Sequence, residues 1–245
     1  MCRHLSYLGP ARTLSGLVLD PPHSLLHQSF APKDMRGPAV ANADGFGIGW
    51  YTAGRAVRYR RSSPMWTDAG LPELACSISS SALLAAVRSA TAGMPVTEAA
   101  CAPFTDGQFL FSHNGFIAGW PESVEGAAGE LSTVELLTLE APTDAALLWA
   151  LVRRRLAAGM PPARALSQVV DRVLTDAPGS RLNFMLTDGH SLYATTWTHS
   201  LSVLRTAESV VLASEPSDAD PRWAPVPDGL VLTATATAVH TDRIE

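Results

Sequence analysis

Two helical segments follow each other directly in this chain, and β-type patterns lie on both sides of them. Residues 143–159 carry apolar side chains at helical spacing, with Thr143 as a suitable N-cap and Gly159 as a C-terminal stop. Residues 162–179 repeat this pattern, beginning at a proline and ending at a glycine. Because strands and helices do not alternate, the sequence predicts antiparallel sheets rather than a parallel sheet built from βαβ units.

Short β patterns fill much of the remaining chain. Before the helices, residues 46–61 predict a hairpin, residues 81–87 a buried strand, and residues 109–115 a strand that runs into an Asn-Gly turn. After the helices, residues 181–197 predict a hairpin around an Asp-Gly turn, and strand patterns recur up to residue 239. We therefore expect the α+β class, as a four-layer αββα sandwich of two antiparallel sheets flanked by helices, in a single domain over residues 1–245.

The bulk composition limits the classes of function. The chain has 245 residues, 47% of them hydrophobic, which is enough for a sizeable core. Its net charge of -5 gives no sign of nucleic-acid binding. No apolar run approaches the ~20 residues that a membrane span needs, and no basic stretch followed by an apolar one marks a signal peptide. We expect a cytoplasmic protein with no nucleic-acid or membrane partner.

The sequence predicts neither a metal nor a cofactor. Its cysteines, Cys2, Cys76 and Cys101, are odd in number and too widely spaced for a zinc motif or a disulfide framework. The histidines contain no HExxH motif. The glycine-rich residues 45–49 lead into a Trp-Tyr pair and a turn instead of a helix, which argues against a dinucleotide site.

Cys2 directly follows the initiator methionine and has two interpretations. It is either a small apolar residue of an N-terminal strand or, once Met1 is removed, the first residue of a mature chain 2–245. In the second case the thiol and a free α-amine belong to one residue, which is how N-terminal-nucleophile hydrolases combine a nucleophile with its base. Position alone favours the first interpretation.

Four further places in the chain are ambiguous when they are taken singly. Arg88 follows a buried strand, so its guanidinium could pair with a nearby acid or bind a substrate carboxylate. Asn114 and Gly115 could form a hairpin turn or an oxyanion hole. Asp144 could stabilise a helix dipole or bind an ammonium group. Glu215 could be a buried acid, but its local sequence favours a loop acid.

The order of these residues along the chain is more specific than any one of them. Cys2, Arg88, the His-Asn-Gly sequence of residues 113–115 and Asp144 together resemble the class II glutamine amidotransferases. The resemblance extends over nearly the whole chain, and it includes MCR, NADGFGIGWY, AAVRSATAGMP, APFTDG, PTDAALLW and RLNFMLTDG. It implies the Ntn-hydrolase fold. Within the family, the stretches MCRHLSYLGP and NADGFGIGWY are most similar to the hydrolases of ergothioneine biosynthesis that cleave γ-glutamyl hercynylcysteine sulfoxide.

The resemblance also implies roles for individual residues. The Cys2 thiolate would attack the γ-carbonyl carbon of a small-molecule γ-glutamyl substrate, with the α-amine moving protons. Asn114 and Gly115 would hold the oxyanion. Arg88 would bind the α-carboxylate of the glutamyl group and Asp144 its α-ammonium, with Thr91 helping to orient this end.

Two departures from the family pattern weaken a prediction of glutamine as substrate. Ala102 stands where many members have histidine, and Ala86-Val87 replaces a histidine shortly before the arginine. One alternative is a glutaminase subunit that supplies ammonia to a synthetase. The synthetase would have to be a separate protein, because a chain ending at Glu245 has no room for a synthetase domain. We expect no obligatory synthetase partner. Another alternative is a regulatory module that binds γ-glutamyl compounds.

The hercynyl part of the substrate that the resemblance implies carries a trimethylammonium group. Aromatic faces bind such cations, so tryptophans could hold it, and the sequence does not choose among Trp50, Trp66, Trp120 and Trp197.

Overall fold

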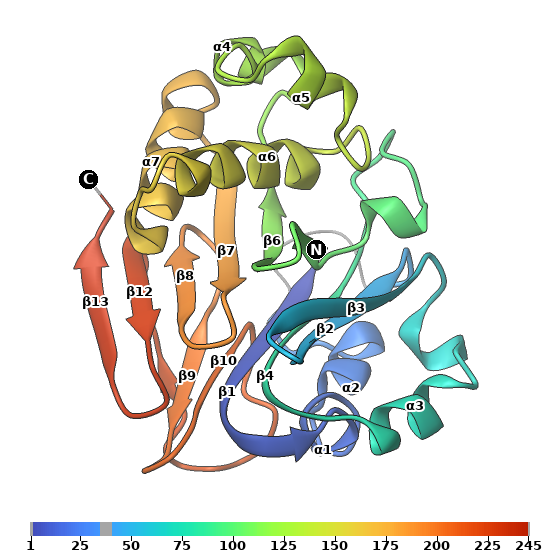
Figure 1. The fold of residues 1–245 in the computed structure, drawn as a ribbon. Coiled ribbons are helices and arrows are strands. Elements are labelled where there is room, and N and C mark those ends of the chain that lie inside the picture. Colours follow the sequence, from blue (N-terminus) through green and yellow to red (C-terminus); the bar gives the residue numbers. More distant parts are fainter. Residues whose placement is uncertain (1, 35–40, 245) are drawn as a thin grey trace.

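A computed structural model of the chain describes residues 2–34 and 41–244. Its first sheet is antiparallel, with strand order β11-β9-β10-β1-β4-β2-β3 (Figure 1). The strands of this sheet are β1 (Arg3–Thr13), β2 (Phe46–Thr52), β3 (Arg55–Arg61), β4 (Ser79–Val87), β9 (Ser202–Arg205), β10 (Val210–Ala213) and β11 (Ala224–Pro225). The predicted hairpin of residues 46–61 is β2 and β3, joined by a turn in which Ala53 and Gly54 both have positive φ.

The second sheet is also antiparallel, with strand order β13-β12-β8-β7-β6-β5. Its strands are β5 (Phe104–Thr105), β6 (Leu110–Phe116), β7 (Arg181–Thr187), β8 (Leu192–Thr196), β12 (Leu230–Ala234) and β13 (Val239–Arg243). The predicted hairpin around Asp188 and Gly189 is β7 and β8, and Gly189 has the positive φ that the turn requires.

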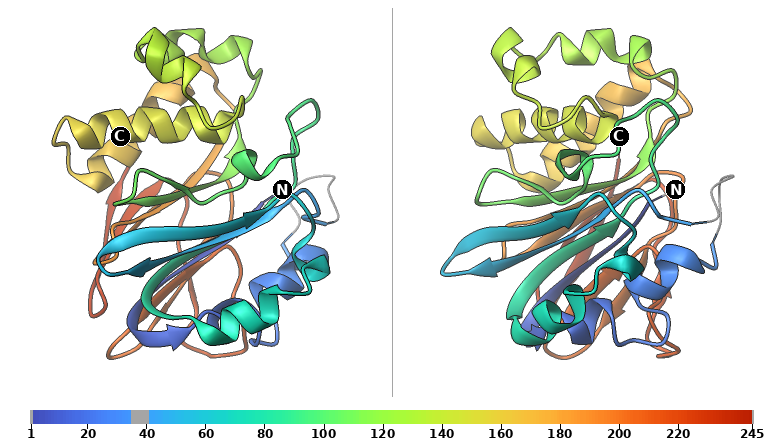
Figure 2. Two further views of the ribbon diagram at one scale, coloured as in Figure 1. Left: turned by 45° about the vertical axis from the view of Figure 1, so that its right-hand side comes forward. Right: turned by 90° about the vertical axis from the view of Figure 1, so that its right-hand side faces the viewer.

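Helices cover the outer faces of both sheets (Figure 2). On the first sheet lie α1 (Ser15–Val18), α2 (Leu25–Phe30) and α3 (Leu71–Ser77). On the second lie α6 (Asp144–Ala157) and α7 (Pro162–Asp176), while α4 (Glu125–Ala128) and α5 (Thr133–Leu137) lie beyond them, farther from the sheet. Short 3-10 helices occupy Met65–Thr67, Glu98–Ala100 and Glu122–Val124. The predicted αββα sandwich is therefore confirmed. No helix within the described residues is long and apolar enough to span a bilayer.

The two predicted long helices begin where their sequences indicate. The Thr143 hydroxyl accepts a hydrogen bond from the Ala146 N–H at 3.3 Å, so Thr143 is the N-cap of α6. Pro162 is the first residue of α7. Both helices bury one face against the second sheet, where Leu151 and Val169 are fully enclosed.

The predicted Asn-Gly turn is wrong. Asn114 and Gly115 lie inside β6, opposite Asn183 and Leu182 of β7, and the strand continues to Phe116. The turn preference of Asn-Gly is a local one, and pairing with β7 along the whole of β6 overrides it. Between β1 and β2, residues 17–34 contain the end of α1 and the whole of α2, while residues 35–40 lie outside the described residues.

One end of the sandwich collects residues that are distant in the sequence. Arg3 at the start of β1 is paired with Val87 at the end of β4, so Cys2 and Arg88 leave the first sheet at the same edge. Leu5 is paired with Ala213, which brings Glu215 to that edge as well. The register of the sheet therefore places the start of β1 between the ends of β4 and β10.

Candidate active site

A pocket lies at this edge, between the two sheets. It is built from the start of β1, the end of β4 and the loop after it, the segment around Ala102, the end of β6 and the start of α6. The candidate residues that line it are Cys2, Arg88, Thr91, Gly115 and Asp144. The structure thus brings together five of the six candidate site residues; the sixth, Asn114, precedes the lining residue Gly115 in β6 but does not line the pocket itself.

Cys2 precedes the first residue of β1 and is half-buried. Its Sγ lies 3.8 Å from the Ser89 carbonyl oxygen, in the segment that follows β4. The predicted removal of Met1 concerns a residue outside the described part of the chain.

Arg88 is buried, with 9% of its surface exposed. Its backbone is fixed by two hydrogen bonds to the Asp44–Gly45 segment before β2, because Arg88 N donates to Gly45 O and Asp44 N donates to Arg88 O. Its Nη1 donates to the Pro95 carbonyl at 2.9 Å. Within the described residues no carboxylate pairs with Arg88, so the expected structural ion pair is not found there. A buried guanidinium with one backbone acceptor keeps donors available for an anion in the pocket.

Asp144 is the first residue of α6 and is 6% exposed. Its Oδ1 accepts from the Ala145 N–H at 2.7 Å and its Oδ2 from the Ile117 N–H at 3.3 Å. These two bonds hold the Asp144 side chain in place at the N-terminus of α6. A cation in the pocket would meet a negative charge opposite the positive charge of Arg88.

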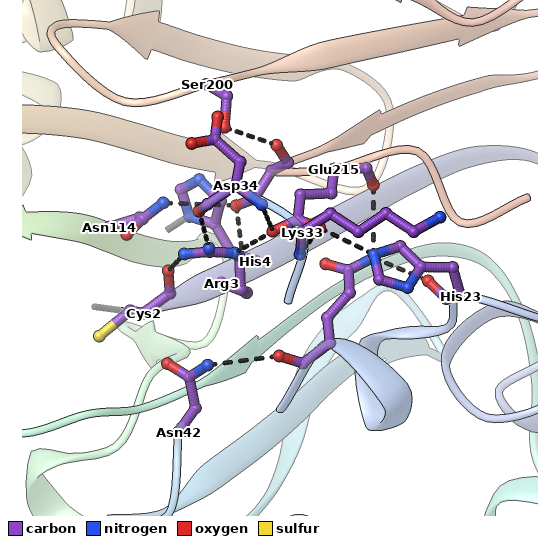
Figure 3. Close-up of polar contacts among 12 residues, drawn as sticks. Cys2, Arg3, His4, His23, Lys33, Asp34, Asn42, Asn114, Ser200 and Glu215 are labelled. Carbon is purple, nitrogen blue, oxygen red and sulfur yellow. Dashed lines mark hydrogen bonds and ion pairs between the residues drawn. The ribbon is translucent and has the colours of Figure 1, made fainter. Parts of the chain in front are cut away.

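Asn114 and Gly115 occupy successive positions of β6 beside the pocket. The buried Asn114 side chain donates from Nδ2 to the Ser214 hydroxyl at 3.4 Å, and its Oδ1 has no hydrogen-bond partner among the described residues (Figure 3). At Gly115 an added Cβ would lie 1.8 Å from the Arg181 carbonyl oxygen, and φ is +157°. Glycine is therefore required here by the pairing of β6 with β7, whatever the chemistry of its N–H.

The remaining candidates lie at the rim or outside the pocket. Thr91 is exposed and belongs to the turn after β4, where its carbonyl accepts from the Met94 N–H at 3.0 Å. None of the tryptophans considered for a leaving group lines this pocket. Trp120 and Trp197 pack against the core under α6 and α7, and Trp50 packs against the core of the first sheet.

The structure adds His113 to the pocket lining. Its Nε2 lies 2.9 Å from the Arg181 carbonyl oxygen, and since a carbonyl only accepts, Nε2 carries the proton. Burial lowers the pKa of His113, while Asp144 and the Arg181 carbonyl oppose that shift. The His-Asn-Gly motif contained this residue, but only the strand register shows that His113 faces the site.

Cys101 is not a competing nucleophile. It is fully buried, and burial raises the pKa of its thiol to about 11. A Cβ added at Gly45 would lie 2.3 Å from the Cys101 Sγ, so the thiol packs directly against this glycine. Cys101 is therefore a small residue of the core.

Potential metal ligands do not cluster in the described residues. His23 and His27 are four residues apart, and their Nδ1 atoms lie 3.1 Å from each other, but no third ligand joins them in residues 2–34 and 41–244. A hydrogen bond between two imidazoles accounts for this pair.

The favoured interpretation of Glu215 as a loop acid is wrong. Glu215 follows β10 but is only 4% exposed, and its carboxylate pairs with the buried Arg3 next to Cys2 at 2.7 Å. The sequence did not show this, because burial of Glu215 depends on segments about 180 to 210 residues away in the chain.

Comparison with known proteins identifies relatives over most of the chain. The family model of class II glutamine amidotransferases matches residues 13–220. The gamma-glutamyl-hercynylcysteine sulfoxide hydrolase of Mycolicibacterium smegmatis is 43% identical over 229 residues, which is 93% of each chain. The protein of the same name from Mycobacterium tuberculosis is 40% identical over 245 residues, covering 100% of this chain and 97% of the relative.

A solved structure shows the same fold at low sequence identity. The glutamine phosphoribosylpyrophosphate amidotransferase of B. subtilis matches 100% of this chain with 49% of its own, at a TM-score of 0.72 and 15% identity. The arrangement of sheets and helices is therefore shared with that enzyme, while its substrates carry no argument for this chain.

Proposed function

Since this chain belongs to the class II glutamine amidotransferase family, we propose that it hydrolyses the γ-glutamyl amide bond of γ-glutamyl hercynylcysteine sulfoxide, a step of ergothioneine biosynthesis. The two relatives that match over more than nine-tenths of the chain carry this activity in their names. The observation that carries the proposal is the single pocket in which Cys2, Arg88 and Asp144 meet.

The glutamyl end of the substrate fits the charges of the pocket. A free glutamyl group carries an α-carboxylate and an α-ammonium on one carbon. Arg88 binds the carboxylate with the donors that Pro95 leaves open, and Asp144 binds the ammonium. Thr91 orients this end from the rim. With both charges held, the γ-carbonyl is directed toward Cys2.

Catalysis then proceeds in two stages. The Cys2 thiolate attacks the γ-carbonyl carbon, so a C–S bond forms and the carbonyl oxygen becomes an oxyanion bound by Asn114 and the Gly115 N–H. The oxyanion collapses, the amide C–N bond breaks, and the amine of hercynylcysteine sulfoxide leaves with a proton. Water then attacks the thioester, which releases glutamate and restores the thiol.

The α-amine of Cys2 is the proposed base once Met1 has been removed. An α-amine has a pKa of about 7.7–8.0, which suits proton transfer near neutral pH. The amine takes the thiol proton through a water molecule and returns it to the leaving nitrogen.

Hydrolysis by the purified protein tests this proposal. Wild type and a Cys2→Ala variant are each given γ-glutamyl hercynylcysteine sulfoxide and, separately, glutamine, and glutamate release is measured alongside the intact mass of the same sample. We expect release from the sulfoxide substrate, loss of that activity in the variant, and a mass that lacks Met1. A Cys76→Ser variant is the matched control, because Cys76 is exposed and lies outside the pocket.

Other outcomes assign other functions. Preference for glutamine would keep the nucleophile and replace the substrate, which would favour an ammonia-supplying glutaminase. Binding of γ-glutamyl compounds without hydrolysis would favour a regulatory module. Full activity in the Cys2→Ala variant would exclude Cys2 as nucleophile.

A further inference from the structure

Glu215 accepts hydrogen bonds from four sites on the chain. Its Oε1 accepts from Arg3 Nε at 2.7 Å and from the Asp34 N–H at 3.2 Å. Its Oε2 lies 2.7 Å from His23 Nε2 and accepts from the Lys33 N–H at 2.9 Å. The carboxylate is thus held from the start of β1, from the turn between α1 and α2, and from the segment after α2.

The Arg3 guanidinium is equally occupied. Arg3 is 2% exposed. Besides Glu215, it donates from Nη1 to the Cys2 carbonyl oxygen at 3.0 Å and from Nη2 to the Asp34 carbonyl oxygen. In Figure 3 the guanidinium lies between the Cys2 carbonyl and Glu215, and the Cys2 sulfur points away from this network. All three nitrogens of the guanidinium therefore have acceptors, and one of these acceptors belongs to the nucleophilic residue.

A nucleophile at the N-terminus of a chain needs a contact that holds its backbone in place. Once Met1 has been removed, Cys2 is joined to the protein by one peptide bond, and the β1 ladder begins only at Arg3. Rotation of the Cys2–Arg3 peptide plane would move the Cα of Cys2, and with it the thiol and the amine, relative to Arg88 and Asp144. A hydrogen bond to the Cys2 carbonyl fixes the plane from which both groups project.

We propose that Arg3 and Glu215 are positioning residues for the nucleophile: Arg3 holds the Cys2 carbonyl, and Glu215 holds Arg3 in place. The proposal rests on the proposed function only in taking Cys2 as a nucleophile that attacks a glutamyl carbonyl, and it does not depend on the leaving group.

The electrostatics support a permanently charged pair. A buried guanidinium without a counter-ion is strongly unfavourable, and Glu215 supplies that counter-ion. Burial raises the pKa of Glu215, but the hydrogen bonds from His23, the Lys33 N–H and Arg3 outweigh burial, so the pKa is lowered overall. Glu215 is therefore ionised throughout the neutral pH range, where it keeps its ion pair with Arg3.

The test separates position from reactivity with two thiol reagents. The first, 6-diazo-5-oxo-L-norleucine, has the glutamyl skeleton and alkylates Cys2 only from the glutamyl subsite; the second, iodoacetamide, needs no subsite. Labelling of Cys2 is followed by mass spectrometry of the N-terminal peptide, which excludes the exposed Cys76. The variants are Glu215→Gln, Arg3→Met and the charge-balanced double variant.

If Arg3 and Glu215 position Cys2, their substitution should slow the reaction with the diazoketone much more than the reaction with iodoacetamide. In each variant kinact for the diazoketone falls by about 100-fold, as expected for a displacement of about 1 Å, while KI and the iodoacetamide rate change less than threefold. The double variant is as slow as either single variant, because both residues serve one restraint. Glu130→Gln is the matched control, since Glu130 joins Arg155 of α6 to Arg172 of α7 outside the pocket, and it keeps wild-type values.

Several results would overturn the proposal. An unchanged kinact in folded variants would show that the pair does not position Cys2. Recovery of kinact in the double variant, or equal losses with both reagents, would assign the pair to general stability. If the neutral variants do not fold, Arg3→Lys carries the test, because it keeps the charge but cannot span Glu215 and the Cys2 carbonyl with one planar fork. Failure of the diazoketone to label wild type would exclude Cys2 as a glutamyl-directed nucleophile, whereas hydrolysis of a different γ-glutamyl amide would change only the substrate.

Discussion

In the proposed function a single residue, Arg88, determines recognition of the glutamyl end. Its charge alone does not distinguish it from lysine, but its planar fork does, because one Nη is already committed to Pro95 and the remaining donors face the pocket. A lysine at this position would have a single flexible ammonium to bind both the Pro95 carbonyl and the substrate carboxylate.

We therefore expect Arg88→Lys to lower kcat/KM by about 10- to 100-fold, mainly through KM. This is the loss of one charge-assisted hydrogen bond of about 1.5–3 kcal/mol. Steady-state kinetics with the γ-glutamyl substrate measure it. Arg58→Lys is the control, because Arg58 pairs with Glu140 and does not line the pocket. A wild-type KM in Arg88→Lys would remove Arg88 from carboxylate binding.

At the scale of the element, β6 sets the geometry of the proposed oxyanion site. The strand runs through the Asn-Gly pair without turning, and Gly115 lies so close to β7 that no Cβ fits. Gly115→Ala should therefore open the β6–β7 pairing and lower the free energy of unfolding by about 1–3 kcal/mol, with loss of activity as a consequence.

Chemical denaturation tests this expectation. Gly179→Ala is the matched control, since Gly179 also has a positive φ, +90°, but an added Cβ there meets no atom within 4 Å. The control therefore measures the conformational cost alone. Equal stabilities of the two variants would mean that contact with β7 contributes nothing at Gly115.

The elements also show which features a sequence can reveal. Helices α6 and α7 were predictable because each segment contains its own periodicity, a start signal (the Thr143 N-cap or Pro162) and a glycine beyond its end. The Asn-Gly pair and Glu215 were not, because their conformation and burial depend on partners such as Asn183 and Arg3 that are distant in the sequence. The order of Cys2, Arg88 and Asp144 indicated one site, but only the sheet register explains why their positions coincide.

At the scale of the whole molecule, a buried histidine joins the two sheets. His4 of β1 is fully buried, and its Nδ1 lies 3.2 Å from the Ser112 hydroxyl of β6. Burial, followed by the charges of His113, His199 and Arg3, lowers the pKa of His4 from 6.5 to about 3. The interface between the sheets thus accepts only the neutral imidazole at ordinary pH.

This depression makes the sandwich sensitive to acid. Well above pH 6.5 His4 is neutral in both the folded and the unfolded chain, so its titration does not change stability there. Between pH 6.5 and about 3 the unfolded chain binds a proton that the folded chain excludes, and stability falls as the pH is lowered. For one such histidine the loss between pH 7.5 and pH 5.5 is about 1.4 kcal/mol, and His113, whose pKa is also lowered, adds to it.

Urea unfolding at pH 7.5 and pH 5.5 measures this loss, in a range above the titration of ordinary carboxylates. A His4→Gln variant should be less stable than wild type at pH 7.5, but its loss on going to pH 5.5 should be smaller by about 1.4 kcal/mol. His240→Gln is the control, because His240 is exposed in β13 and its removal should leave the pH dependence unchanged. If His4→Gln lost as much stability as wild type over this interval, His4 would have to accept its proton in the folded state, and the space between the sheets would have to admit a charge.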